Sequence, residues 1–206
     1  KDGFTPLHEA LIAGSSDNVR LYLELLKGCD PYLQAKVLTS ANAADFTPLH
    51  DALKEGNPEN FRLYLALLND CDSELKAQVL TSATKDGFTP LHEALKEGNP
   101  ENVSSCIKLL KGCDPELQTQ VLTSANAAGF TPLHEALISG SSENVRLYLD
   151  LLRECDKPLQ TKVLTSANAA GFTPLHSALK EGNPENVRLY LALLSQCGRD
   201  LQARVL

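Results

Sequence analysis

The residues with the greatest capacity for chemistry in this sequence are its histidines and cysteines, and they recur at a fixed interval. All five histidines are 42 residues apart, and five of the six cysteines follow the same interval. A ladder of imidazoles could bind metal ions or transfer protons, and a ladder of thiols could bind metal ions or form disulfides. The two sets are His8, His50, His92, His134 and His176, and Cys29, Cys71, Cys113, Cys155 and Cys197.

The spacing of these residues nevertheless favours structural roles. Each interval supplies one histidine, without an acidic residue four positions later in every copy, so no ligand set or acid–base pair recurs. The cysteine interval matches neither a C-x-x-C motif nor a compact disulfide framework, and free cysteine packs as a small hydrophobe. We therefore predict packing roles for both sets, no metal and no cofactor. Unbridged thiols also predict a reducing environment, in the cytoplasm or elsewhere inside the cell.

The elements that position these side chains repeat with the same interval. Phe-Thr-Pro-Leu-His occurs five times in phase, and no linker interrupts the pattern. Repetition of this kind predicts stacked units that share one continuous core. We therefore expect a single solenoid rather than separate domains, and both ends lie in phase with the repeat, as in a window of a longer array. Its units are residues 1–42, 43–84, 85–126, 127–168 and 169–206.

Each unit carries start signals for three helices. In the first unit Thr5 is suited to an N-cap and Pro6 to the first helical position, and Gly14 is expected to end the helix with a positive φ. The second helix begins at a serine or an Asn-Pro-Glu run and is apolar on nearly all sides, which predicts burial on two sides. The third begins at Asp30. No segment alternates with a period of two, so we predict an all-α fold.

The string at 47–61 resembles the ankyrin repeat: it reads Thr-Pro-Leu-His-x-Ala-Leu-x-x-Gly-Asn-x-Glu-Asn-Val, with Phe61 in place of the final valine. The resemblance covers the first helix, the glycine turn and much of the second helix of every unit. It implies a right-handed-type helical solenoid that acts as a non-enzymatic protein–protein interaction module with an extended concave face. The ankyrin period is about 33 residues, so a third helix, as at 31–41, replaces the family's usual finger. Three-helix armadillo-type repeats match the length but not the motif.

The resemblance also implies which residues bind a partner. In ankyrin repeats, positions 9, 12 and 13 of the unit and the loop before them line the concave face, and these positions differ between the five copies. Unselected variation of an exposed surface would give the same pattern. The candidate residues are Glu9, Ile12, Asp45, Asp51, Lys54, Glu55, Asp86, Glu93, Lys96, Glu97, Glu135, Ile138, Ser177, Lys180 and Glu181.

The third unit departs from the others in its second helix. It reads Val-Ser-Ser-Cys-Ile at 103–107, where the other units read Val or Phe, then Arg-Leu-Tyr-Leu. Ser104 replaces an arginine, Ser105 a leucine expected in the core and Cys106 a tyrosine expected in the core. Such a loss of volume is consistent with a pocket or a reactive thiol at mid-array, or with a drifted or locally repacked unit.

Composition limits the class of partner. The net charge of −7 disfavours nucleic acid, and the absence of a long apolar run predicts no membrane span. Residues 43–84 hold seven acidic and three basic residues, so a partner with basic groups is expected to favour the N-terminal half.

Neither end carries a polar cap, which predicts end-to-end self-association. A structural spacer, or a fragment of a longer and even engineered array without its own ligand, is the alternative function.

Overall fold

The computed structural model describes residues 3–54, 57–181 and 183–206, and within these ranges the chain forms helices and no strand. The helices fall into sets of three, and the first helix of each set begins 42 residues after that of the set before. The helices are α1 (Pro6–Ala13), α2 (Ser16–Lys27), α3 (Pro31–Leu38), α4 (Pro48–Lys54), α5 (Pro58–Asp70), α6 (Ser73–Thr81), α7 (Pro90–Glu97), α8 (Pro100–Lys111), α9 (Pro115–Thr123), α10 (Pro132–Ser139), α11 (Ser142–Glu154), α12 (Lys157–Thr165), α13 (Pro174–Glu181), α14 (Pro184–Leu194) and α15 (Arg199–Val205).

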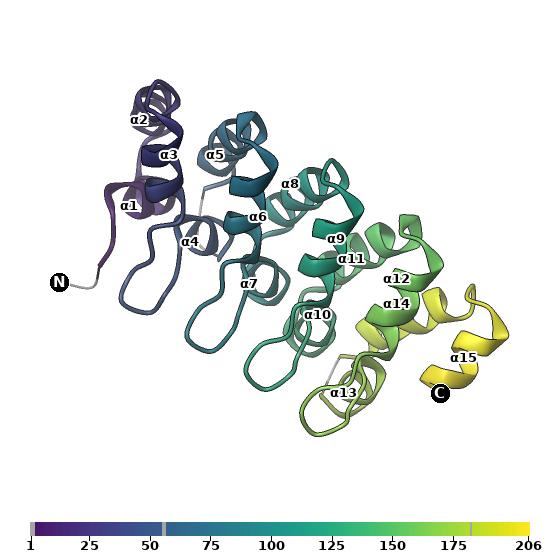
Figure 1. Ribbon diagram of the computed structural model, residues 1–206. Coiled ribbons are helices and arrows are strands. Elements are labelled where there is room, and N and C mark those ends of the chain that lie inside the picture. Colours follow the sequence, from purple (N-terminus) through teal and green to yellow (C-terminus); the bar gives the residue numbers. More distant parts are fainter. Residues whose placement is uncertain (1–2, 55–56, 182) are drawn as a thin grey trace.

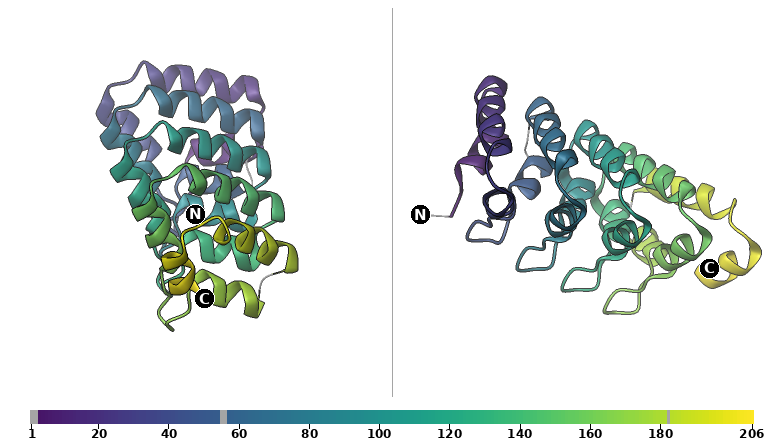
Figure 2. Two further views of the ribbon diagram at one scale, coloured as in Figure 1. Left: turned by 90° about the vertical axis from the view of Figure 1, so that its right-hand side faces the viewer. Right: turned by 45° about the horizontal axis from the view of Figure 1, so that its top comes forward.

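Helices of the same kind stack on one another along the molecule. First helices pack on first helices, as α4 does on α7, and second helices on second helices, as α5 does on α8. The third helices form a further row, and the loops that follow them project on one side of the array (Figure 1). Figure 2 shows the same rows from two other directions. The all-α helical repeat solenoid predicted from the sequence is confirmed.

The predicted helix starts are also found. In the first set, the Ser15 hydroxyl accepts a hydrogen bond from a backbone N–H of α2, and the Asp30 carboxylate accepts one from Leu33 at the start of α3. Pro6 occupies the first turn of α1, where a missing N–H breaks no helical bond. These local signals recur in later sets, so the chain builds the same three helices again.

The core is shared between neighbouring sets, because the second helices are covered on two sides. Leu67 on α5 is 5% exposed, whereas Leu25, its counterpart on α2, is 70% exposed, because no described helix packs on that side of α2. Not every apolar position is buried in this way. Leu63 and Leu147, the counterparts of Ser105, are half-buried and pack against the core, so Ser105 replaces a leucine at the margin of the core rather than one inside it.

The glycine that follows the first helix of each unit has a different role from the predicted one. Gly14 adopts φ −69°, which any residue can adopt, so the expected positive φ was wrong. A side chain there would instead collide with the backbone of the preceding helix, because a Cβ would lie 2.4 Å from the Ala10 carbonyl oxygen. Positive φ occurs at the end of the loop between sets, where Gly87 has φ 79° and Asp45 has φ 63°.

Candidate protein-binding surface

The histidines join one set of helices to the next. The Nδ1 atom of His50 accepts a hydrogen bond from the Thr47 backbone N–H at 3.1 Å, which leaves the proton on Nε2. Nε2 donates it to the Phe88 carbonyl oxygen of the next set at 3.0 Å. Burial is the main cause that lowers the pKa of His50, and of its counterpart His92, to about 4. The ring is therefore a neutral donor with a structural role, and the bond to the next set was not predicted.

A second inter-set bond comes from an asparagine that the sequence analysis did not single out. The Asn144 side-chain nitrogen donates to the carbonyl oxygens of Ala94 at 3.4 Å and Gly98 at 2.8 Å. Asn60 and Asn186 make the corresponding bonds to the sets before them. The signal was present, because position 18 holds asparagine in all five units. Its counterpart Asn18 is exposed, since no described helix packs on that side of α2.

The repeated cysteines cap the second helices. Each Sγ–H donates a weak bond to the carbonyl oxygen four residues earlier, as from Cys71 to Leu67 at 3.4 Å. Burial raises the pKa of Cys71, Cys113 and Cys155, which keeps these thiols protonated and unreactive. Within the described ranges no group of three histidine, cysteine or acidic side chains is placed to hold a metal ion.

The loops between sets stack closely on one another. The Ala127 N–H donates to the Asp86 carbonyl oxygen at 2.8 Å, and the Ala169 N–H donates to Ala128 at 3.0 Å. A glycine permits this approach, because a Cβ on Gly87 would lie 2.9 Å from the backbone of the next loop. Asp45 replaces that glycine in the second unit. No corresponding backbone bond follows it among the described residues, and Lys85 reaches back with its side chain instead.

The predicted binding residues divide into buried and accessible groups. Position 9 is almost wholly buried in four of the five sets, although we expected it to face a partner. Positions 12 and 13 and the loop residues are half-buried or exposed, and Glu55 lies outside the described residues. The buried residues are Asp51, Glu93, Glu135 and Ser177, and the accessible ones are Glu9, Ile12, Asp45, Lys54, Asp86, Lys96, Glu97, Ile138, Lys180 and Glu181.

The middle of this surface is a network of acidic and basic side chains. The Glu97 carboxylate lies 3.3 Å from the ammonium group of Lys54 and 3.5 Å from that of Lys96. Burial raises the pKa of Glu93 and of Glu135, and the nearby lysines partly oppose this effect. The carboxylates are thus held close together and neutralised in part by lysines from the same surface.

Aromatic rings lie beside this network, at a repeated position that sequence reasoning did not assign to the binding surface. Lys54 and Lys96 lie over the rings of Phe46 and Phe88, at 5.7 and 5.3 Å from the ring centroids. These rings are half-buried, and Phe4 is 44% exposed. We use the name loop face for the surface that consists of these phenylalanines, the accessible predicted residues and the loops between sets. It offers apolar rings bordered by carboxylates.

The divergent residues of the third set lie elsewhere, on α8. Ser104 and Ser105 are half-buried, and Cys106 is 1% exposed, in the place of the buried Tyr64 and Tyr148. Burial raises the pKa of the Cys106 thiol to about 12. These properties oppose a reactive thiol, one of the alternatives drawn from the sequence, while a groove does open beside Ser105.

Comparison with known proteins supplies the family. A family model described as "Ankyrin repeats (3 copies)" matches residues 101–204, and one described as "Ankyrin repeat" matches residues 2–36. No curated protein matches the chain. None of the described helices is long and apolar enough to cross a bilayer. Ankyrin repeats are generally protein–protein interaction modules and are typically non-enzymatic. Since these matches cover more than half of its length, the chain belongs to the ankyrin repeat family.

Proposed function

We propose that this chain binds a protein partner through the loop face. The observation that carries the proposal is the combination of accessible phenylalanine rings with a row of carboxylates on one continuous surface. Apolar side chains of a partner can pack on these rings, and lysine or arginine side chains of a partner can pair with the carboxylates. The partner segment would therefore carry both apolar and basic side chains.

The isoleucines at position 12 distinguish one part of the loop face from another. The second, third and fifth sets hold a lysine there, as at Lys96, whereas the first and fourth hold Ile12 and Ile138. Both isoleucines are half-buried. An apolar side chain beside an accessible ring gives a partner a larger apolar contact than a lysine does.

The test replaces these isoleucines with the residue that neighbouring sets already use. Ile12→Lys with Ile138→Lys should fold, because the same helix carries lysine in three sets. The control, Gln78→Lys with Gln120→Lys, adds the same charge on third helices at a position where other sets hold lysine or arginine. Partners from a cell lysate would be identified by quantitative mass spectrometry. Proteins retained by the wild type and the control but lost by the isoleucine variant support the proposal, and equal recovery by all three contradicts it.

We further propose that the two ends of the array bind each other between copies of this chain. Leu179 on α13 is 66% exposed, whereas its counterparts Leu95 and Leu137 are fully buried against the next set. At the other end, Asn18 exposes the amide that elsewhere binds the preceding set. The two ends are therefore the two halves of the joint that recurs within the array, and such heterologous joints produce open chains.

Sedimentation velocity over a range of concentrations tests this second proposal. The average mass should rise with concentration for the wild type and remain that of a monomer for Leu179→Glu, because a charge in the joint would lose its hydration. Gln120→Glu, an exposed change on α9 in the middle of the array, is the matched control and should assemble like the wild type. A monomeric wild type, or assembly of Leu179→Glu to the same extent, would refute end-to-end association.

A further inference from the structure

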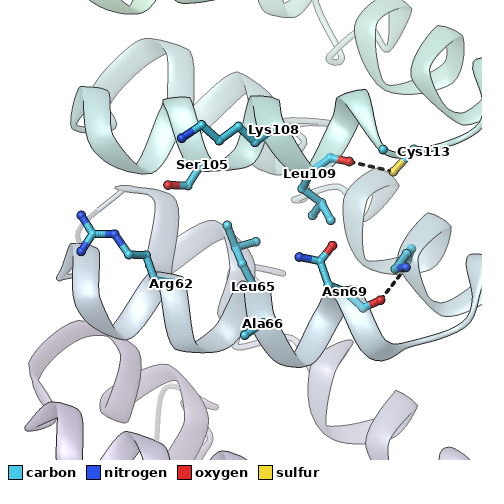
Figure 3. A pocket seen from close by; sticks show the side chains of 10 residues that line it. Arg62, Leu65, Ala66, Asn69, Ser105, Lys108, Leu109 and Cys113 are labelled. Atoms are coloured by element: carbon cyan, nitrogen blue, oxygen red, sulfur yellow. Dashed lines mark hydrogen bonds between the residues drawn. The ribbon is translucent and has the colours of Figure 1, made fainter.

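A groove of about 310 Å³ runs between the second helices α5 and α8, on a different surface from the loop face. Figure 3 shows Arg62, Leu65 and Asn69 on α5 and Ser105 and Lys108 on α8, with both groups of side chains bordering the space between the helices. The apolar floor comes from leucines of both helices. The groove therefore offers a polar rim over an apolar base.

The divergent sequence of the third unit creates this opening. Ser105 stands where every other unit holds a leucine. In the equivalent groove between α2 and α5 the corresponding side chain is Leu63, and that groove measures about 200 Å³. A serine removes most of a leucine's volume, so it leaves space for a side chain from outside the chain.

The charge of this groove also differs from that of its neighbour. Arg62, Lys76 and Lys108 line it, and no carboxylate does. The α2–α5 groove holds two basic and two acidic residues, and its Lys27 forms an ion pair with Asp70 across the two helices. The α5–α8 groove is thus a basic site on an acidic protein.

Part of this basic character is available to a ligand. Arg62 pairs with Glu59 at 3.4 Å and with Glu101 at 3.0 Å, and Lys76 donates to the Asn69 carbonyl oxygen at 2.9 Å. Among the described residues, by contrast, neither the Lys108 ammonium group nor the Ser105 hydroxyl has a hydrogen-bond partner. The guanidinium of Arg62, the Lys108 ammonium and the Ser105 hydroxyl lie towards the same end of the groove (Figure 3).

We propose that this groove binds an acidic side chain in an extended segment of a protein partner. The carboxylate accepts hydrogen bonds from Lys108 and Ser105 and lies close to Arg62, and a neighbouring apolar side chain packs on Leu65 and Leu109. From Arg62 to Asn69 the helix rises about 10 Å, which matches about three residues of extended chain. The bound segment is therefore short, with one acidic and one apolar residue.

Two substitutions test the groove without disturbing the fold, because each introduces a residue that other units hold at the same position. Ser105→Leu fills the groove, and Lys108→Glu introduces the residue of the first unit, Glu24. Lys162→Glu, an exposed change on α12, is the control of equal charge. Thermal unfolding of each variant verifies that the array is intact.

Fluorescence anisotropy with a short labelled peptide, in which glutamates alternate with leucine and alanine, measures binding. Each groove variant should raise the dissociation constant about ten-fold, while Lys162→Glu leaves it unchanged. The same peptide with glutamines in place of the glutamates should not bind. Absence of saturable binding to the wild type, equal binding by the groove variants, or equal binding of the glutamine peptide would each overturn the proposal.

The loop-face variant separates this proposal from the preceding one. Ile12→Lys with Ile138→Lys changes residues remote from Ser105, so it should bind the acidic peptide as the wild type does. If that variant loses the peptide and the groove variants keep it, the peptide occupies the loop face and the groove proposal fails. If the loop face binds no partner from a lysate, the first proposal fails, but the peptide can still bind to the groove.

Discussion

Replacing His50 with glutamine should remove part of the acid sensitivity of this protein. The folded state keeps His50 neutral, because burial lowers the pKa of its imidazole from 6.5 to about 4. The unfolded chain binds a proton at the ordinary pKa. Between pH 6.5 and pH 4 the unfolded state therefore holds more protons, and the free energy of unfolding falls as the pH falls.

The size of the effect follows from the shift. Each pH unit within this window changes the free energy of unfolding by about 1.4 kcal/mol for one such group. At pH 5 the loss from His50 alone is about 2 kcal/mol relative to pH 7. Glutamine does not titrate, and its amide can still donate to the Phe88 carbonyl oxygen that His50 now binds. His50→Gln should therefore lose about 2 kcal/mol less than the wild type when the pH is lowered from 7 to 5.

Urea unfolding followed by circular dichroism at pH 7 and pH 5 provides the measurement. Asn144→Ala is the control, because it breaks an inter-set hydrogen bond without removing a histidine. It should lose as much free energy of unfolding between pH 7 and pH 5 as the wild type does. The reasoning is refuted if His50→Gln shows the same loss between the two pH values as the wild type, or if Asn144→Ala reduces that loss equally.

Three further outcomes are expected. Asp45→Gly should raise the free energy of unfolding by about 0.5–1 kcal/mol, because glycine adopts the positive φ without strain; a lower urea midpoint would contradict this. Asn144→Ala should cost about 1–3 kcal/mol by leaving carbonyl oxygens of the preceding set unbound, whereas Asn18→Ala should cost less than about 0.5 kcal/mol; similar costs would exclude the inter-set bond as the cause. Maleimide should label Cys106 after half-buried Cys29, as mapped by mass spectrometry of peptides; equally fast labelling would show that Cys106 is accessible.

Sequence reasoning was most reliable where the cause is local. The interval of 42 residues and the caps at Ser15 and Asp30 identify the helices, because each signal acts within one turn of helix. The role of Gly14 was misjudged for a related reason. A glycine that follows a helix commonly adopts a positive φ. Only the structure reveals that a carbonyl oxygen lies where a side chain on Gly14 would be.

The candidate surface was less predictable, because it depends on contacts between sets. All five units hold asparagine at position 18, which indicates a shared structural role. The sequence did not reveal that this role is a hydrogen bond from Asn60 to the backbone of the preceding set. Position 9 varies as a surface residue would, yet Glu93 is nearly buried between neighbouring elements. The groove beside Ser105 required knowledge of which residues α5 places across from it. These relations link residues about 42 to 50 positions apart, beyond the reach of a local pattern.

The paired histidine and asparagine bonds have a consequence for how the gene can change in length. His50 donates forward to the next set, and Asn60 donates backward to the one before, so every joint uses the same two donors in opposite directions. A recombination event that duplicates or deletes 42 codons in phase therefore creates a joint whose hydrogen bonds are already matched. Changes of whole units preserve the fold, whereas changes of any other length leave donors without acceptors.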